Sequence, residues 1–499
     1  MATAKTINVF SSPLPVFSEK GTDGKATGYS VELARLIAKE AGYTATFFQL
    51  PFEQSQRQLH SQPFQVTTGL VRIPAREQDY HWITPINANP IRIYTRSDSV
   101  MTSNATTLQS LRSVAVLKED YRHQLLKERY EGKIIALDSW ADAITALLND
   151  TVDGILFSEV GVNAICNRAQ LDCATLRQGP VIEVFYSYIA MPKMEENTEV
   201  AERLANAAIA FKRSVDFLNL HARWLPSLSD FSANVTVAEG IVGFGFELED
   251  VIVDDIWVIT SPEPLFSQLN SQGQPEGYAV ELVEQVLQRA GIKKPILAAP
   301  WERIMRESEQ KSNVIAFALT RTPEREPHLH WITPITRGIH GLFGDKAFPK
   351  LNALDEIDKQ TKIAVLAHDY RKDIAEEKGL NTFEFATWPE AVKALAEGEV
   401  DLLFGSDGAL NYGCEKSAVN CDNMHRVFDY KTTTTYLTLS KPGTRIPLVE
   451  RLKAAAYETK KGAFIDNWSS DWELFLKAQP IGPVHVEKGV VNFWQRPSE

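Results

Sequence analysis

Four cysteines are the residues of this sequence whose type and spacing most directly imply a covalent reaction. They form two pairs with six residues between the members, Cys166 with Cys173 and Cys414 with Cys421. Free thiols can be buried as small hydrophobic side chains, but they would have no reason to recur as matched pairs. A zinc site would need closer spacing and recurring His or Cys partners. The pattern therefore favours two local disulfides, formed in an oxidising compartment.

Four arginines carry the other recognisable chemistry. Arg76 and Arg325 each stand two residues after a proline, in what the sequence predicts to be the first turn of a helix. A guanidinium is a fixed fork of donors that matches a carboxylate, although an arginine at such a place is commonly a solvated charge. Arg72 and Arg321 stand four residues earlier and could reach the same anion. We expect these two to be exposed turn residues.

All of these residues occur twice because the chain is a tandem duplication. The string HWITPI stands at 81–86 and again at 330–335. An offset of 249 also superimposes GYSVEL on GYAVEL and DYR on DYR, and an offset of 248 superimposes the cysteines. Solenoid repeats run to only about 20–50 residues, so a repeat of this length is a copied domain. We predict two units, 1–249 and 250–499.

Composition is that of an ordinary globular protein, with 44% hydrophobic and 23% charged residues. A net charge of −12 disfavours a nucleic-acid partner, which requires clustered Lys and Arg. No run approaches the ~18–20 apolar residues of a membrane span, and the first residues, MATAKTINVF, contain no apolar signal core. We expect a periplasmic, exported protein whose signal peptide is absent from this chain.

Strand and helix patterns alternate within each unit. VELARLIAKEAG places apolar residues on one helical face and ends at Gly42, and TATFFQL and SVAVL read as strands. Alternation over units of roughly 30 residues predicts an α/β fold with mostly parallel sheets flanked by helices. Such sheets bind ligands at the carboxyl ends of their strands. His81 and His330 lack a metal or proton-relay partner pattern, and we expect packed histidines.

Five motifs follow one another in order along the chain: P-x-F (15–17 and 264–266), G-Y-x-V-E-L (28–33 and 277–282), ALTRTPEREPHLHWITPI (318–335), IAVLAHDY (363–370) and EVDLLFGSDGALNY (399–412). On these motifs both units resemble the family 3 extracellular solute-binding proteins, which are type II periplasmic binding proteins that serve polar amino-acid importers. The resemblance covers nearly all of both copies.

The resemblance implies a two-lobed Venus flytrap fold in each unit, closing on its ligand. HWITPI would approach the first crossover between lobes, and FYSYIAM and TTTYLTL would be the returning strands. The implied boundaries in unit 1 are lobe 1 at about 5–90 plus 192–225, lobe 2 at about 91–191 and a C-terminal strand segment at 233–246. Those in unit 2 are lobe 1 at about 254–339 plus 441–473, lobe 2 at about 340–440 and a strand segment at 482–495.

In unit 2 the resemblance assigns a ligand carboxylate to Arg325, with Thr320 as a second donor and Trp301 as an aromatic plate. The family acid for the ligand ammonium is replaced by Ser406, with Asp407 one residue later. The family's helix start that touches the carboxylate carries Asp369, a predicted N-cap whose charge would repel an anion. Tyr370 could offer a hydroxyl instead.

In unit 1 the same roles fall on a weaker set of side chains. Arg76 would take the carboxylate and Phe52 would be the plate, but Val71 cannot donate. The remaining ligand-binding candidates are Tyr121, Ser158 and Glu159, and Asp120 is the predicted N-cap. We therefore predict unequal clefts, with the stronger one in unit 2.

We expect a monomeric binding protein that captures a small polar, amino-acid-like solute for an ABC-type importer, without cofactor, metal or catalysis. A ligand-sensing periplasmic domain of a sensor kinase or receptor is the alternative, because tandem clefts of this type form some sensor heads. The fold also occurs in cyclohexadienyl dehydratases, and Glu159 is the one candidate for the general acid that such an enzyme requires.

Overall fold

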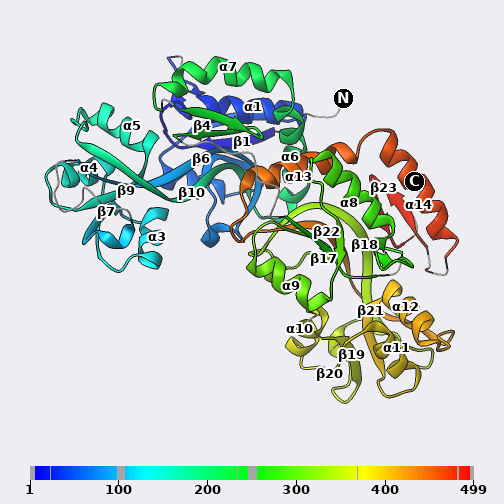
Figure 1. Ribbon diagram of the computed structural model, residues 1–499. Coiled ribbons are helices and arrows are strands. Elements are labelled where there is room, and N and C mark those ends of the chain that lie inside the picture. The colour runs from blue at the N-terminus through cyan, green and yellow to red at the C-terminus, as the bar shows by residue number, and fades with distance from the viewer. Residues whose placement is uncertain are drawn as a thin grey trace. The chain divides into compact units, whose positions relative to one another are not determined.

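A computed structural model describes residues 6–22, 24–97, 107–232, 234–245, 256–263, 265–367, 369–479, 481 and 483–494. The chain divides into two compact units, residues 1–251 and 252–499. The predicted boundary at 249/250 lies outside the described residues, as does Pro264 of the second P-x-F motif. Figure 1 shows both units as sheets covered by helices. Among the described residues, no helix is both long and apolar enough to cross a membrane.

Unit 1 is built on one large mixed sheet in which most neighbours are parallel within each half. Its strand order is β4-β1-β5-β10-β6-β9-β7-β8. The strands are β1 Thr6–Ser11, β4 Thr44–Gln49, β5 Gln65–Val71, β6 Tyr80–Arg96, β7 Ser113–Leu117, β8 Lys133–Leu137, β9 Gly154–Ser158 and β10 Leu176–Pro192, with the short pair β2 Glu19–Lys20 and β3 Ala26–Thr27. The helices are α1 Tyr29–Glu40, α2 Phe52–Leu59, α3 Tyr121–Arg129, α4 Trp140–Leu148, α5 Glu159–Ala169, α6 Thr198–Lys212 and α7 Val215–Ser229, with 3-10 turns at η1 Pro74–Arg76, η2 Leu108–Ser110 and η3 Glu195–Asn197.

Unit 2 repeats this design with the order β16-β13-β17-β22-β18-β21-β19-β20. The strands are β13 Trp257–Thr260, β16 Ile296–Ala298, β17 Val314–Thr320, β18 Leu329–Asp345, β19 Lys362–Leu366, β20 Asn381–Phe385, β21 Leu402–Ser406 and β22 Met424–Ser440, with the short pair β14 Gln268–Leu269 and β15 Pro275–Glu276. The helices are α8 Tyr278–Arg289, α9 Trp301–Gln310, α10 Tyr370–Glu377, α11 Trp388–Ala396, α12 Asp407–Ser417, α13 Ile446–Thr459 and α14 Ala463–Lys477, with 3-10 turns at η5 Pro323–Arg325 and η6 Leu354–Glu356.

Two long strands in each unit join a pair of lobes, as Figure 1 shows. In unit 2 these are β18 and β22, which are both 17 residues long and run antiparallel. We call the part with β13, β16, β17, α8, α9, α13 and α14 lobe 1, and the part with β19–β21 and α10–α12 lobe 2. Separate hydrophobic cores fill the two parts. HWITPI opens β18 and its copy opens β6, and TTTYLTL and FYSYIAM lie in β22 and β10, which confirms the predicted crossover and return strands.

The repeated tryptophan of HWITPI is held by an arginine that the sequence places in an exposed turn. The guanidinium of Arg321 lies 5.6 Å from the ring of Trp331 and pairs with Glu326 at 2.5 Å. Trp331 also packs edge-on against Tyr436 of the return strand, at 5.4 Å. Unit 1 repeats this cluster with Arg72, Trp82, Glu77 and Tyr188. The expectation of exposed turn residues is wrong for Arg72, which is 15% exposed, because the ion pair and the ring surfaces bury it.

The proline carbonyl of HWITPI accepts a hydrogen bond from a lysine of the last helices. Lys460 Nζ donates to the carbonyl of Pro334, and Lys212 makes the same bond to Pro85. Burial, and secondarily the charge of Arg337, lowers the pKa of Lys460 to about 7. The repeated string therefore forms the packed start of a crossover strand, and His330, buried within it, is a packed histidine as predicted.

A C-terminal hairpin adds to each sheet beside the crossover strand. Strands β11 (Val235–Ala238) and β12 (Ile241–Phe244) pair with one another, and β12 pairs in parallel with β6. Strands β23 (His485–Glu487) and β24 (Val490–Asn492) do the same against β18. Both turns place two residues at positive φ, which matches the twist of a two-residue hairpin and explains Gly240 and Gly489. The equivalence predicted for these segments is confirmed for the described residues; residues 233, 246, 482 and 495 lie outside them.

Glycine precedes the first helix of each unit for a steric reason. Gly28 and Gly277 have φ of 120° and 133°, and an added Cβ would lie 2.4 Å and 2.5 Å from a backbone oxygen of the P-x-F loop. The G-Y-x-V-E-L motif therefore fixes the loop after the first strand against the first helix, at the edge where parallel strands end.

Both predicted disulfides are formed, Cys166–Cys173 and Cys414–Cys421. Each ties the end of a lobe 2 helix, α5 or α12, to the segment that leads into the return strand. The described residues contain no free cysteine and no cluster of metal-ligating side chains.

Candidate functional site

The candidate site of unit 2 lies where η5 of lobe 1 meets α10 of lobe 2. The sequence folds locally for identifiable reasons: Pro323 opens the 3-10 turn that carries Arg325, and Asp369 caps α10 by accepting from the Arg371 amide. Arg325 Nη1 donates to the carbonyl of Thr320 at 2.9 Å. This bond holds the guanidinium at the end of β17, where a parallel sheet presents its ligand-binding edge.

Three of the predicted residues surround the same point. The guanidinium carbon of Arg325 lies 5.2 Å from the ring of Trp301 and 6.0 Å from the ring of Tyr370. Arg325 is 6% exposed and Tyr370 is 7% exposed. Burial lowers the pKa of Arg325, but a guanidinium remains charged in proteins. Burial raises the pKa of Tyr370 to about 12, so its phenol is neutral at pH 7. The two lobes thus meet over a desolvated cation.

The aspartate that sequence reasoning expects to repel an anion is neutralised. Asp369 accepts from Arg371 Nε at 2.6 Å and from Arg371 Nη2 at 2.7 Å, so the two groups form a bidentate pair. Although burial opposes ionisation, the Arg371 guanidinium holds the pKa of Asp369 below its ordinary value. The same pair recurs in unit 1 between Asp120 and Arg122.

Sequence reasoning misses three side chains of this site. His340 on β18 shares a hydrogen bond between its Nδ1 and the Tyr370 hydroxyl, and burial holds its pKa well below the ordinary value. Lys431 pairs across from His340, and its Nζ lies 5.6 Å from the Tyr370 ring. Glu263 stands exposed in the loop after β13, and desolvation by the groups around its carboxyl raises its pKa to about 7.

Two further candidates of unit 2, Ser406 and Asp407, lie where β21 ends and α12 begins. The Ser406 hydroxyl accepts from the Ala409 amide and caps α12, while its backbone pairs with His340. Asp407 points to Arg426, 3.4 Å away on β22. Ser406 therefore borders the group around Tyr370, whereas the Asp407 carboxylate is engaged elsewhere.

Unit 1 assembles part of the same arrangement. Arg76 Nη1 donates to the carbonyl of Val71 at 3.0 Å, and its guanidinium lies 5.8 Å from the ring of Phe52, which is 50% exposed. Burial lowers the pKa of Arg76, and the Asp120 carboxylate opposes that shift. The plate of unit 1 is therefore smaller and more open than Trp301.

The lobe 2 candidates of unit 1 are spread out. Tyr121 packs edge-on against Phe185, with ring centroids 4.7 Å apart. Ser158 caps α5 by accepting from the Gly161 amide. The Glu159 carboxylate lies against Gly245, where an added Cβ would meet its Oε2 at 1.9 Å.

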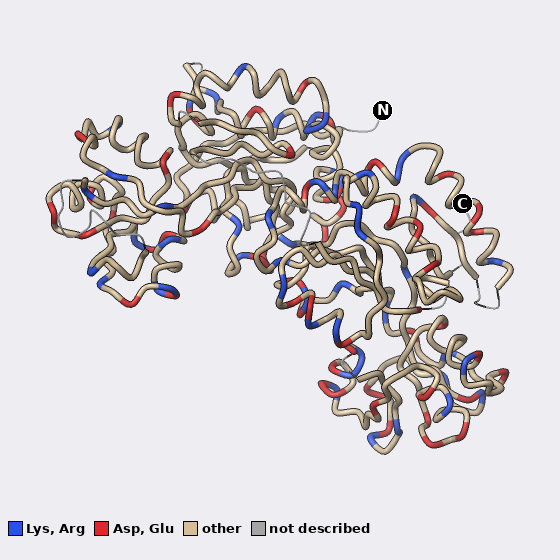
Figure 2. Tube along the Cα trace, in the orientation of Figure 1, with Lys and Arg blue, Asp and Glu red and all other residues tan. Residues whose placement is uncertain are grey.

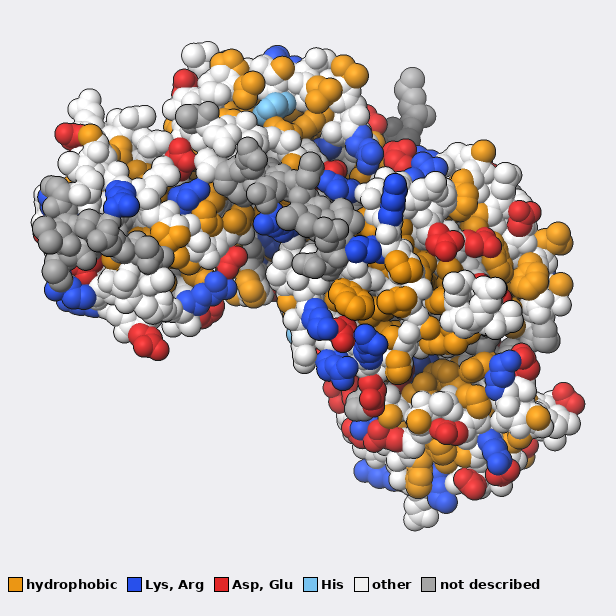
Figure 3. All heavy atoms as spheres, viewed as in Figure 1, with side chains coloured by type: hydrophobic (Ala, Val, Ile, Leu, Met, Phe, Trp, Pro, Cys, Tyr) orange, Lys and Arg blue, Asp and Glu red, His pale blue; other side chains and the backbone are white. Residues whose placement is uncertain are grey.

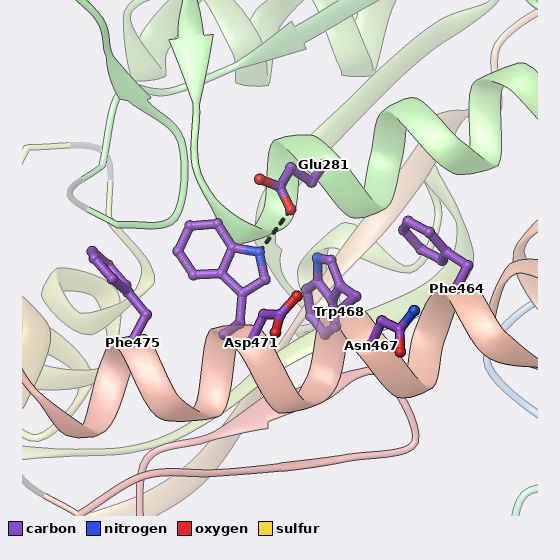
Figure 4. A pocket seen from close by; sticks show the side chains of 7 residues that line it. Glu281, Phe464, Asn467, Trp468, Asp471 and Phe475 are labelled. Carbon is purple, nitrogen blue, oxygen red and sulfur yellow. Dashed lines mark hydrogen bonds between the residues drawn. The ribbon is translucent and has the colours of Figure 1, made fainter.

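Charges of both signs surround these sites. Figure 2 shows Lys and Arg beside Asp and Glu in both units, and Figure 3 shows them mixed over the outer surface at α9 and α10. A separate surface groove lies on lobe 1 of unit 2, between α8 and α14, lined by Glu281, Phe464, Asn467, Trp468, Asp471, Trp472 and Phe475 (Figure 4). Trp472 Nε1 donates to Glu281 at 2.7 Å within it. Lobe 2 contributes nothing to this groove, so lobe closure would not enclose a solute there.

Comparisons with known proteins agree with this architecture. The model of the bacterial extracellular solute-binding proteins, family 3, matches residues 7–227 and 256–351. The ABC transporter arginine-binding protein 1 of Escherichia coli (strain K12) is 22% identical over 231 residues, which are 45% of this chain and 93% of that protein. The arginine-binding periplasmic protein of Mannheimia haemolytica is 25% identical over 165 residues, 33% of this chain and 66% of that protein.

Solved structures also match the chain. A mutant of ArgBP from T. maritima is 20% identical over 44% of this chain and 95% of its own, with a TM-score of 0.37. The B. pertussis BvgS periplasmic domain is 14% identical over 95% of this chain and 94% of its own, also with a TM-score of 0.37.

Proposed function

Because the chain belongs to family 3 of the bacterial extracellular solute-binding proteins, we propose that it captures a small amino-acid-like solute between the lobes of unit 2. One observation carries the proposal: the buried guanidinium of Arg325, in lobe 1, faces Tyr370 of lobe 2 and lies over the Trp301 ring. A charged fork that is desolvated between two lobes is suited to a carboxylate that enters when the lobes part.

Trp301 completes this arrangement because it presents an aromatic face at the same point. An apolar or cationic part of a solute would pack there. We propose binding rather than catalysis, which the names of the curated relatives support, since both describe binding proteins. Glu159, the candidate for a general acid, lies against Gly245 rather than beside Tyr121 or Arg76.

A thermal-shift screen of amino acids, peptides and polyamines on the whole chain tests this function. We expect one class of solute to raise the melting temperature, and Arg325→Ala to abolish the shift. Arg306→Ala is the matched control, because Arg306 is an exposed arginine of α9 in the same lobe. A shift that survives Arg325→Ala would contradict the proposal, and the shift should be unchanged in Arg306→Ala.

We propose further that the exported protein delivers its solute to an ABC-type permease, in keeping with the first curated relative. The duplication supports a second candidate, a ligand-sensing domain of a membrane receptor, because two clefts in one chain allow two solutes to bias one output. Uptake of the labelled solute in cells that lack the gene separates the two. Loss of uptake supports import, whereas unchanged uptake with loss of a solute-dependent transcriptional response supports sensing.

A further inference from the structure

Two cations of unit 2 converge on one aromatic ring, and neither forms a salt bridge with a described residue. Arg325 and Lys431 lie 6.0 Å and 5.6 Å from the ring centroid of Tyr370. They come from different elements, η5 and β22. Among the described residues, no carboxylate oxygen lies within 4.0 Å of either charge.

The guanidinium of Arg325 also has N–H donors that could bind a ligand. An arginine side chain carries five N–H donors. Within the described part of the chain, Arg325 makes one side-chain hydrogen bond, to the carbonyl of Thr320. Its planar edge can therefore take a bidentate anion without breaking an ion pair.

The described acids around Tyr370 are not paired with these two cations. Asp369 is bound by two donors of Arg371, and Asp407 is paired with Arg426. The charges of Arg325 and Lys431 help to lower the pKa of Glu324, an exposed residue of lobe 1, but no ion pair joins Glu324 to either cation. Glu263 lies near Arg371, and the charge of Glu309 acts on Arg325 although no ion pair joins them. Arg325 and Lys431 are therefore both available to bind an anion.

We propose, building on the function proposed above, that unit 2 takes a small dicarboxylate, of which an acidic amino acid is the simplest example. One carboxylate binds the fork of Arg325 over Trp301, and the other binds the ammonium of Lys431 beside Tyr370. A cationic side chain in the same place would face Lys431, a like charge. The preference thus differs from the arginine that the names of the curated relatives give for those proteins.

Unit 1 has the opposite charge at the second position. Its strand pair Ile91↔Glu183 corresponds to His340↔Lys431 of unit 2. Glu183 is paired with Arg129 at 2.8 Å. Unit 1 therefore lacks the second cation and is an internal comparison for the dicarboxylate site.

Isothermal titration of the whole chain with L-glutamate, L-aspartate, glutarate, L-glutamine and L-arginine tests the proposal. We expect L-glutamate to bind at least about tenfold more tightly than L-glutamine, since a hydrogen bond between charged groups is worth about one to two decades of affinity. Lys431→Gln should weaken L-glutamate by about tenfold or more and change L-glutamine by less than about threefold. Lys431→Arg should retain the preference, and Lys416→Gln, on the exposed end of α12, should leave every affinity unchanged.

Two contrary results differ in meaning. If L-glutamine or L-arginine binds through Arg325 more tightly than any dicarboxylate, or if Lys431→Gln leaves L-glutamate unaffected, the dicarboxylate assignment is overturned and the proposed function stands. If Arg325→Ala leaves the binding of every solute intact, the proposed function itself fails. Because Lys431 is exposed, its variants should fold, and a wild-type melting temperature without solute verifies this.

Discussion

Arg325 of lobe 1 lies 6.0 Å from the ring of Tyr370 in lobe 2. The two residues are separated by a complete crossover strand, so the contact exists only because β18 and β22 bring the lobes together. A solute bound to Arg325 would therefore be covered by Tyr370, and its release would require the lobes to separate.

The Asp369–Arg371 pair should be a major contribution to the stability of unit 2. Asp369→Asn keeps an N-cap residue but removes the charge, leaving a buried guanidinium unpaired, and we expect a loss of about 3–5 kcal/mol in the free energy of unfolding. Urea unfolding followed by circular dichroism measures this loss. Adding Arg371→Met should restore a large part of it.

The control for this substitution is an exposed pair in the same lobe. Asp355 lies 3.5 Å from Lys378, with both side chains about half exposed or more. Asp355→Asn should cost less than about 1 kcal/mol. Equal losses for the two variants would show that burial of the Asp369 pair has no energetic consequence.

Much of this architecture could be predicted because the duplication doubles every signal. Motifs such as HWITPI and the cysteine spacing occur twice, so the hairpins and the disulfides could be assigned from pattern, while the crossover strands are implied by the family resemblance. The pairing of Asp369 with Arg371 could also have been predicted, because DYR recurs in both units. A side chain that is repeated beside a cap residue is a signal for a structural ion pair.

The rest of the candidate site has no such signal. His340 and Lys431 correspond to Ile91 and Glu183, so comparison of the copies does not single them out. Their approach to Tyr370 depends on strand register across β18 and β22, which local periodicity does not determine. The prediction of an exposed Arg72 is wrong for a related reason. Arg72 is buried against Trp82 and Tyr188, which lie on β6 and β10.

The disulfides should contribute to stability in both units. Each closes a short loop, with a sequence separation of 7, for which the loop-closure entropy corresponds to about 2–3 kcal/mol. Thiol titration under denaturing, non-reducing conditions should find no free thiol in the native preparation. Replacing Cys414 and Cys421 together by Ser should lower the unfolding free energy by about that amount, and an unchanged value would contradict the estimate.

Glu263 should give unit 2 a specific dependence on pH. Desolvation of the carboxyl, on a residue that is otherwise exposed, raises the pKa of Glu263 to about 7 from an ordinary 4.5, while Arg371 lowers it and Asp369 raises it. Between these values the native state holds a proton that the unfolded state has lost, so stability contributed by this group falls as pH rises from about 4.5 to about 7.

Glu263→Gln should remove that part of the slope, which urea midpoints measured across the same pH range would detect. Glu377→Gln, at the exposed end of α10, serves as the control for replacing a carboxyl group. A slope that is the same in the Glu263 variant and in the wild type would mean that Glu263 does not hold the proton.

The two units should differ in occupancy. Unit 2 has Trp301 and Lys431 where unit 1 has the half-exposed Phe52 and Glu183. The direct measurement is the stoichiometry of solute binding to the whole chain by isothermal titration, in the wild type and in Arg325→Ala and Arg76→Ala variants. We predict one molecule per chain, lost in Arg325→Ala and retained in Arg76→Ala; loss of binding in Arg76→Ala with intact binding in Arg325→Ala would contradict the account.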